Sequence, residues 1–363
     1  MSQAYPRHAA SPLLLEVEDL VTRYPIPRGI VGTLVRRPRE AVHAVEGISF
    51  TVAEGEMVAL VGESGCGKTT VAQTAMRLVD ATAGTIRFRG LDITRRSHSD
   101  LRPLRRRMQI IYQDPYDSLD PRFRVRQTVE EPLLIHRIGT ASERRELVAG
   151  ALERAGLTPP DLFLNRYPHE LSGGQRQRVA IAAALVLEPE LLVADEPVSM
   201  LDVSVRAGIL ALLDQLRRGG LGVLMITHDL STAAHFADRI AVMYLGRIVE
   251  EGPARQVVDD PKHPYTRALI SVVPNKDPRV PTTPHILRGE TPNPVSLPAG
   301  CRFHPRCPVL ESGEAAALGV DGRCLGEDPS LVAVAEDHRA ACHAAGLMAK
   351  TLAGGSSPEL GHH

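Results

Sequence analysis

The stretch EMVALVGESGCGKTTVAQTAMRLV, residues 56–79, decides the fold of this chain. An apolar run that predicts a strand is followed by GESGCGKT, Gly62 to Thr69, and then by a segment that predicts a helix. The loop fits the pattern G-x-x-x-x-G-K-[ST], the P-loop, in the structural context that such a loop requires. Its glycines let successive N–H groups face one anion, and the helix start adds its dipole. The stretch therefore predicts an α/β fold that binds a phosphorylated ligand here.

The residue types of this loop indicate a nucleotide with Mg²⁺. Lys68 is expected to reach the β- and γ-phosphates, and the Thr69 hydroxyl is expected to ligate the metal ion. Because the loop works through backbone amides, the thiol of Cys66 is expected to be incidental. The ATP-binding residues expected in the loop are Gly62, Ser64, Gly65, Cys66, Gly67, Lys68, Thr69 and Thr70.

A second segment, LLVADEP, is an apolar strand that ends at two acids, Asp195 and Glu196. This is the Walker B arrangement, in which the first acid holds Mg²⁺. The second acid follows one residue later and is placed to polarise the water that attacks the γ-phosphate. Together with the loop, the acidic pair predicts nucleotide hydrolysis.

A third segment, LSGGQRQR, residues 171–178, predicts another anion site. Ser172, Gly173 and Gly174 open an expected helix, whose bare N–H groups and dipole favour an anion. Taken alone, Ser-Gly-Gly would be an ordinary helix cap. Beside the P-loop and the acidic pair, the segment resembles the signature motif of ABC-type ATPases.

The resemblance covers about residues 13–252 and implies an ABC ATPase nucleotide-binding domain at 1–252. The expected class is α/β: a P-loop NTPase ABC cassette with a RecA-like mixed sheet core, an antiparallel β subdomain and a helical subdomain. Helical periodicity places that helical subdomain at about 116–187. After residue 252 the composition becomes proline-rich. We therefore expect a small irregular C-terminal domain at 253–350 and a disordered tail at 351–363.

In ABC ATPases two such domains pack head to tail, so that ATP lies between one P-loop and the partner's signature. The resemblance therefore assigns Ser172, Gly173, Gly174 and Gln175 to the ATP of the partner subunit. It implies that Gln113 in IYQDP is the Q-loop glutamine, that Ser199 to Asp202 form the D-loop, and that His228 contacts the γ-phosphate. Tyr24 is the expected platform for adenine. The expected catalytic set is Glu196, His228, Lys68 and Gln113, with Thr69, Gln113 and Asp195 for Mg²⁺.

Composition limits the partners and the location. The 363 residues carry a formal charge of −1, which offers no attraction to nucleic acid. No run of about 18 apolar residues predicts a membrane span, and the N-terminus does not resemble a signal peptide. We expect a cytosolic protein, peripheral on the cytoplasmic face of the inner cell membrane as the resemblance implies. The final GHH is either native or the remnant of a tag.

One cassette without membrane segments favours the separate ATPase subunit of an importer over an exporter. A non-transport ABC ATPase usually has two cassettes or a long coiled coil, and this sequence shows neither pattern. HPYTRALISVVP, residues 263–274, and ILRGETPNPVSLPAGCRFHPRCP, residues 286–308, resemble dipeptide and oligopeptide importer ATPases. YQDPYDSLDPR is closer to their F-type subunit. The resemblance implies a D-type ATPase partner, two permeases and an extracytoplasmic binding protein. Peptides are the expected cargo, with nickel complexes, glutathione or sugars as alternatives.

Four of the five cysteines lie near the C-terminus, at Cys301, Cys307, Cys324 and Cys342. In a reducing compartment four thiolates suit a soft metal centre rather than disulfides. Zinc favours C-x₂₋₄-C pairs, which are lacking here, whereas a 4Fe–4S cluster tolerates irregular spacing. From the residues alone, cluster, zinc and unligated thiols all stay open. The resemblance to peptide-importer ATPases implies a 4Fe–4S cluster. His304, His338 and His343 are further candidate ligands.

Overall fold

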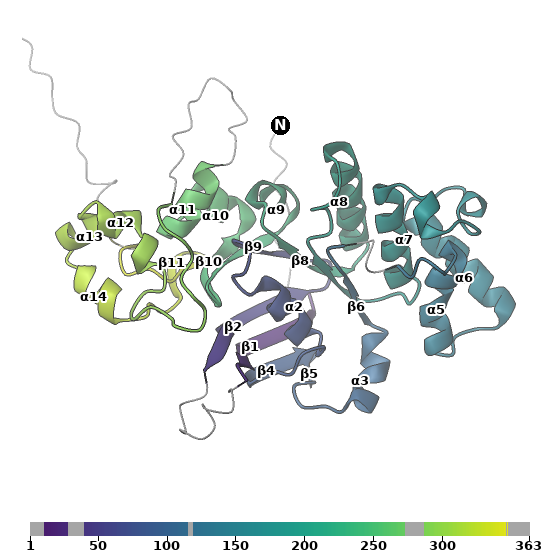
Figure 1. The fold of residues 1–363 in the computed structure, drawn as a ribbon, viewed down its shortest axis with the longest axis horizontal. Helices are drawn as coiled ribbons and strands as arrows, with labels where there is room; N and C mark the ends of the chain where they lie inside the picture. The colour runs from purple at the N-terminus through teal and green to yellow at the C-terminus, as the bar shows by residue number, and fades with distance from the viewer. Residues whose placement is uncertain (1–10, 28–39, 115–118, 273–286, 346, 348–363) are drawn as a thin grey trace, which may run out of the picture.

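The computed structural model describes the chain except for residues 1–10, 28–39, 115–118, 273–286, 346 and 348–363 (Figure 1). The tail expected at 351–363 thus lies outside the described residues. A central sheet carries the fold, with a helical region on one side and the C-terminal region on the other (Figure 1). Within the described residues, no helix has the length and apolar character needed to cross a membrane.

The central sheet has the strand order β11-β12-β10-β9-β3-β8-β7-β6. Its middle strands, β9, β3, β8, β7 and β6, run parallel. Every residue of β3, β7 and β8 is buried, as expected for apolar runs covered on both faces. The bounds are β3 Met57–Val61, β6 Met108–Ile111, β7 Leu191–Asp195, β8 Gly222–Thr227, β9 Arg239–Tyr244 and β10 Arg247–Pro253.

The hairpin predicted at Leu245–Gly246 is present between β9 and β10. Both turn residues have positive φ, 43° and 80°, the conformation that a two-residue hairpin turn requires. The loops that carry the predicted motifs follow the carboxyl ends of the parallel strands. The sheet therefore gathers these motifs at its carboxyl edge, where open α/β sheets bind ligands.

A second, antiparallel sheet has the order β2-β1-β4-β5 and lies below the central sheet in Figure 1. The long strands β1 and β2 pair along their whole length, Leu13 with Ala53 at one end and Pro25 with Ala41 at the other. Alternating burial in β1 reflects its one covered face. The bounds are β1 Leu13–Pro25, β2 Ala41–Ala53, β4 Ala83–Phe88 and β5 Leu91–Asp92.

Helices follow the edge strand β6, as the periodicity of 116–187 predicted. Val129, Val148 and Val179 are buried in the core that joins three of these helices to the central sheet. Figure 1 shows this group at the right, away from the antiparallel sheet. The helices of this half are α2 Lys68–Ala75, α3 His98–Arg105, α5 Val125–Ile135, α6 Ala141–Arg154, α7 Gly173–Leu185, α8 Val203–Arg218 and α9 Leu230–Phe236.

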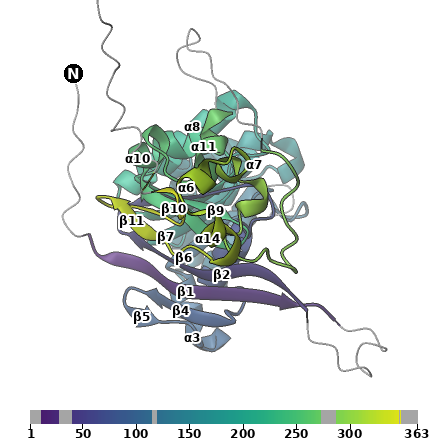
Figure 2. The ribbon, with the colours of Figure 1, turned by 90° about the vertical axis from the view of Figure 1, so that its left-hand side faces the viewer.

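The C-terminal region is not separate from the central sheet. After α10, Ala254–Asp259, and α11, Pro264–Ser271, the chain forms short helices and returns as β11, Val332–Ala335, and β12, His338–Ala340. β12 pairs antiparallel with β10 and extends the sheet. Figure 2 shows the yellow strand β11 beyond β10. The shift in composition at residue 252 gave no indication of this pairing. The short helices are α12 Pro308–Glu311, α13 Glu314–Ala317 and α14 Asp321–Gly326.

The HPY segment, which begins at His263, starts helix α11. His263 caps α11, because its Nδ1 accepts a hydrogen bond from the N–H of Tyr265 over 3.0 Å, and Pro264 takes the first helical position. The buried carboxylate of Glu250 accepts bonds from the N–H groups of Lys262 and His263 and from Nε2 of His338. This carboxylate therefore joins β10, α11 and β12.

Candidate active site

The P-loop has the predicted strand–loop–helix context, between β3 and α2. Two positions of the loop have room only for glycine. A Cβ on Gly62 would lie 2.2 Å from the Met243 carbonyl oxygen, and a Cβ on Gly67 would lie 2.1 Å from the Ala44 carbonyl oxygen. Gly67 also has a φ of 106°. The loop is thus held closely against β2 and β9.

Lys68 is buried and its ammonium group is held by the loop itself. Nζ donates hydrogen bonds to the carbonyl oxygens of Gly62, over 2.7 Å, and Glu63, over 2.9 Å. Cys66 is also buried, and burial raises the pKa of its thiol. Its side chain is not part of the cleft lining, although Cys66 is among the predicted ATP-binding residues, and the expectation that its thiol is incidental stays a prediction.

A cleft of about 740 Å³ opens over the loop. It brings together eleven of the predicted residues from five separate segments of the chain. Five further residues line it without having been predicted, namely Val42, Ala44, Glu63, Leu269 and Pro294. The predicted residues that line it are Tyr24, Gly62, Ser64, Gly65, Gly67, Lys68, Thr69, Thr70, Gln113, Glu196 and His228.

Asp195 lies beside the loop at the end of β7, only 3% exposed. Burial raises the pKa of its carboxyl group, as does the neighbouring Glu196, whereas a hydrogen bond with the Thr69 side chain and the charge of Lys68 lower it. Its Oδ1 is buried and has no hydrogen-bond partner among the described residues. A buried carboxylate oxygen without a partner, next to a threonine hydroxyl, is the donor chemistry that Mg²⁺ prefers. The residues present therefore fit the ion.

Glu196 is held between two predicted catalytic residues. Its Oε2 accepts a hydrogen bond from Nε2 of Gln113 over 3.1 Å, and its Oε1 lies 3.2 Å from Nδ1 of His228. Glu196 has a φ of 46°, which turns the chain sharply after β7. Gln113 follows β6 and His228 follows β8, the strands on either side of β7. Three adjacent strand ends thus place one carboxylate between an amide and an imidazole.

The expected adenine platform lies on the antiparallel sheet. Tyr24 is 38% exposed and is paired in register with Val42. The carbonyl of Pro294 accepts a hydrogen bond from the N–H of His43 over 3.0 Å, which places this C-terminal residue beside the same strand. An aromatic ring flanked by apolar side chains suits a purine base.

The LSGGQ segment starts α7 and lies apart from the cleft. Ser172 caps this helix by accepting a hydrogen bond from the N–H of Gln175 over 3.3 Å, and Gln175 Oε1 accepts one from the N–H of Ser172 over 3.0 Å. Gly174 is packed against α8, so that a Cβ there would lie 2.4 Å from Cγ1 of Val205. None of Ser172, Gly173, Gly174 and Gln175 lines the P-loop cleft.

The segment Ser199–Asp202 connects the acidic pair to α8. Ser199 Oγ donates to the carbonyl oxygen of Glu196 over 3.1 Å, and Asp202 caps α8 by accepting from the N–H of Val205 over 3.0 Å. That hydrogen bond, with one from Ser204, lowers the pKa of Asp202. Met200 and Val203 are 61% and 81% exposed. One exposed apolar side chain of this loop, Met200, thus lies close in sequence to another at the start of α8, Val203.

The four C-terminal cysteines line one cavity of about 20 Å³, together with His263, His304, His343 and apolar side chains of the same region. Burial raises the pKa of Cys301 to about 12 and that of Cys342 to about 11, and it also raises the pKa of Cys307 and Cys324. No three His, Cys, Asp or Glu side chains in the described part of the chain are arranged to hold a metal ion.

The three candidate histidines have other partners. His304 Nδ1 lies 3.0 Å from the carbonyl oxygen of Cys301, and His343 Nε2 lies 2.9 Å from that of Glu327. His338 is bound to Glu250 and does not line the cysteine cavity. The cavity therefore presents thiols as its main donors.

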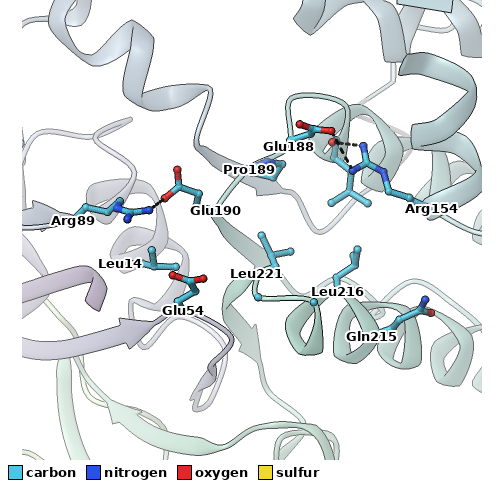
Figure 3. A pocket seen from close by; sticks show the side chains of 13 residues that line it. Leu14, Glu54, Arg89, Arg154, Glu188, Pro189, Glu190, Gln215, Leu216 and Leu221 are labelled. Carbon is cyan, nitrogen blue, oxygen red and sulfur yellow. Dashed lines mark hydrogen bonds and ion pairs between the residues drawn. The ribbon is translucent and has the colours of Figure 1, made fainter. Parts of the chain in front are cut away.

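Another cavity, of about 450 Å³, lies at the amino ends of β7 and β8, away from the predicted motifs (Figure 3). Four of its charged side chains form two pairs, Arg89 with Glu190 and Arg154 with Glu188 at 3.9 Å, and Glu54 also lines it. This end of a parallel sheet is opposite the end that binds ligands in such folds. We assign it no ligand.

Comparison with known proteins finds transporter families for both parts of the chain. The family model "ABC transporter" matches residues 45–199, and the model "Oligopeptide/dipeptide transporter, C-terminal region" matches residues 249–313. A Sinorhizobium fredii protein named "Probable peptide ABC transporter ATP-binding protein" is 46% identical over 92% of this chain and 90% of its own length. An oligopeptide transport ATP-binding protein of Bacillus subtilis is 43% identical over 91% of this chain and 97% of its own.

A solved structure resembles the first part of the chain. It is the dimeric, post-hydrolysis state of an ATP-binding cassette bound to ADP and phosphate, with 29% sequence identity and a TM-score of 0.57. The match covers 67% of this chain and 99% of that cassette. The uncovered third is comparable in extent to the C-terminal region.

Proposed function

This chain belongs to the ABC transporter ATP-binding proteins, in the group with the oligopeptide/dipeptide transporter C-terminal region, and from that premise we propose that it energises peptide import by hydrolysing ATP in the P-loop cleft. The observation that carries the proposal is the position of Glu196 between Gln113 and His228, in the cleft that also contains Lys68. A carboxylate held at its two oxygens beside a phosphate-binding loop is placed to act as a base toward water.

Each residue of the cleft has a distinct task. The N–H groups of the loop and the ammonium group of Lys68 bind the β- and γ-phosphates. Asp195 and Thr69 would hold Mg²⁺, which when bound offsets the negative charge of the phosphates. Gln113 and His228 orient Glu196, whose carboxylate accepts a proton from the attacking water. Positioning and charge stabilisation supply most of the rate in phosphoryl transfer.

We propose further that the ATP site is completed by a partner ATPase of the D-type. In support, Ser172 to Gln175 lie outside the cleft of their own chain, and Met200 and Val203 are exposed near the Asp202 turn. Two permeases and an extracytoplasmic binding protein would complete the importer, with this chain peripheral on the cytoplasmic face. Because those other subunits contact the cargo, nickel complexes, glutathione or sugars remain the alternative to peptides.

The test is reconstitution with the candidate partner ATPase and permeases in liposomes, with peptide and binding protein supplied. We expect ATP turnover to rise when a transported dipeptide or oligopeptide is present, and to stay at its basal rate with nickel, glutathione or a sugar. A chain that hydrolyses ATP equally with and without permeases would contradict a transport role. Stimulation by one of the other cargoes would replace the peptide assignment.

We also propose that Cys301, Cys307, Cys324 and Cys342 bind a 4Fe–4S cluster. The donor set supports this, because four thiols from separate segments line one cavity. The cavity of about 20 Å³ holds about one water molecule, so its side chains would have to move for a cluster to enter. Protein purified without oxygen should be brown, absorb near 400 nm and contain iron and sulfide. Colourless protein with zinc alone would assign the site to zinc, and metal-free protein would leave the thiols unligated.

A further inference from the structure

Glu63, a position that the P-loop pattern G-x-x-x-x-G-K-[ST] leaves unspecified, is bound by the C-terminal region at both its backbone and its side chain. Its N–H donates to the hydroxyl of Tyr265 over 2.9 Å. Its Oε2 accepts hydrogen bonds from Nη1 of Arg306 over 2.8 Å and from the Thr291 hydroxyl over 3.0 Å, and its Oε1 accepts one from Nη2 of Arg306 over 3.2 Å. Three residues more than 200 positions away thus fix this one residue.

The carboxylate of Glu63 lies where negative charge is unfavourable. It lines the cleft and is 28% exposed, next to the loop that binds phosphates. A negative charge at the edge of a site for a nucleotide triphosphate repels the phosphates and weakens nucleotide binding. Burial raises the pKa of Glu63, but hydrogen bonds from Arg306 and Thr291 and the charge of Arg306 outweigh it, so the pKa is lowered and the carboxylate stays ionised.

Arg306 is well placed to cancel this charge. Its two terminal nitrogens bind the two carboxylate oxygens, a bidentate arrangement that is both strong and directional. The side chain is 8% exposed, and the guanidinium lies 5.9 Å from the ring centre of Tyr244. Arg306 ends the short helix His304–Arg306, immediately before Cys307. Its position is therefore set by the folded cysteine-containing segment.

The pairing of Glu63 with Arg306 affects Lys68, the lysine of the P-loop. The ammonium group is a charge partner of Glu63 and already donates to the Glu63 carbonyl oxygen. Without Arg306, the free carboxylate would compete with the phosphates for Lys68. With Arg306 in place, the Glu63 carbonyl accepts a hydrogen bond from Lys68, and Arg306 neutralises the Glu63 carboxylate.

We propose that Arg306 is a positioning residue of the ATP site, supplied by the C-terminal region, which neutralises Glu63 and keeps Lys68 available to the nucleotide phosphates. The inference rests on the proposed ATP site and adds a residue outside the matched cassette. It explains why the cassette and the C-terminal region form one unit: the second completes the charge balance of the first.

The test is the affinity of the full chain for ATP, ADP and AMP, measured by titration calorimetry on wild type, Arg306→Gln, Glu63→Gln and the double variant. We expect Arg306→Gln to weaken ATP binding about tenfold, to weaken ADP binding less and to weaken AMP binding least. The reason is that repulsion between the Glu63 carboxylate and the nucleotide grows with the charge of the phosphates. Glu63→Gln should bind ATP within about threefold of wild type. Adding Glu63→Gln to Arg306→Gln should restore ATP binding to a similar level, since it removes the uncompensated carboxylate.

Two controls separate this inference from the proposed site itself. Arg288→Gln removes an arginine of the same region that pairs with Glu311 rather than with the loop, and should leave affinity unchanged. Lys68→Ala should lose ATP binding, and its failure to do so would contradict the site and not only Arg306. Unchanged ATP binding in Arg306→Gln, equal losses for all three nucleotides, or a double variant no better than Arg306→Gln would overturn the proposal.

Discussion

Gln113 donates a hydrogen bond of 3.1 Å to Glu196, although the two residues are 83 positions apart in the chain. The bond exists because β6 and β7 are parallel neighbours, so that the residues after them meet at one edge of the sheet. It directs one oxygen of the carboxylate before any water arrives. Preorganised polar groups of this kind supply a large part of catalysis.

Glu196→Gln should bind ATP normally and hydrolyse it at least about a hundredfold more slowly, because an amide cannot accept the proton from water. Phosphate release under single-turnover conditions, together with ATP affinity, measures the two effects separately. Glu188→Gln is a matched control, since Glu188 pairs with Arg154 at the opposite end of β7. Near-normal turnover in Glu196→Gln would remove this residue from the role of base.

Substitution of the two glycines of the signature segment should have different effects, on stability at Gly174 and on ATP turnover at Gly173. Gly174→Ala places a Cβ 2.4 Å from Cγ1 of Val205, and should lower the melting temperature by several degrees through overpacking. Adding Val205→Ala should recover most of the loss. Gly173→Ala meets only Leu201 Cδ2 at 3.5 Å, so it should fold normally and reduce ATP turnover in the assembled dimer. Equal melting temperatures for the two alanine variants would contradict this division.

Val203→Glu should weaken association with the partner ATPase. The side chain is 81% exposed beside the Asp202 cap, and an apolar group of this kind is stabilised by burial in an interface. Sedimentation of the Glu196→Gln variant with ATP and the partner would give the fraction of dimer. Leu162→Glu is the comparison, since Leu162 is also exposed, at 56%, but belongs to the helical region. Equal dimer fractions for both variants would exclude Val203 from the interface.

The stability of the chain should fall in mild acid because of His263. Burial lowers the pKa of this imidazole to about 4, and the charge of Glu250 only partly offsets the effect. The unfolded chain therefore binds a proton between about pH 6.5 and pH 4 that the folded chain does not, so stability is full above pH 6.5 and is lost toward pH 4. The complete shift corresponds to roughly 3 kcal/mol.

Urea unfolding between pH 7.5 and 5 measures this dependence. His263→Asn keeps an oxygen that can accept the N–H of Tyr265 but does not titrate, so its stability should vary less with pH. His343→Asn is the control, because the hydrogen bond of the His343 ring is with a backbone carbonyl, that of Glu327. An unchanged slope in His263→Asn would assign the acid sensitivity to other groups.

The sequence predicted the parts of the fold that depend on local pattern. Apolar runs that end in polar residues marked β3, β7 and β8, and Leu245–Gly246 marked the hairpin after β9. The same patterns predicted that Lys68, Asp195 and Glu196 lie at or just after strand ends, at the edge of the sheet. Their assigned roles stay predictions, but the cleft shows that most of these residues share one site.

Contacts across long stretches of chain could not be predicted. Nothing in the residues around Tyr265 indicates that its hydroxyl binds the N–H of Glu63, because such a contact has no periodicity and no spacing. The pairing of β12 with β10 has the same character: three residues, His338 to Ala340, are too short for a strand pattern. Pro294 could be placed in the cleft only once the path of the chain was known.

The pairing of β12 with β10 has a consequence for biosynthesis. His338, the partner of the Glu250 carboxylate on β12, is synthesised 88 residues after Glu250. During translation β10 is therefore an open sheet edge with a charged group facing the growing core, and open edges invite pairing with other chains. The interval corresponds to several seconds at ordinary rates of synthesis. A chaperone that covers this edge, or a slower ribosome, should change the yield of folded subunit more than substitutions on the surface do.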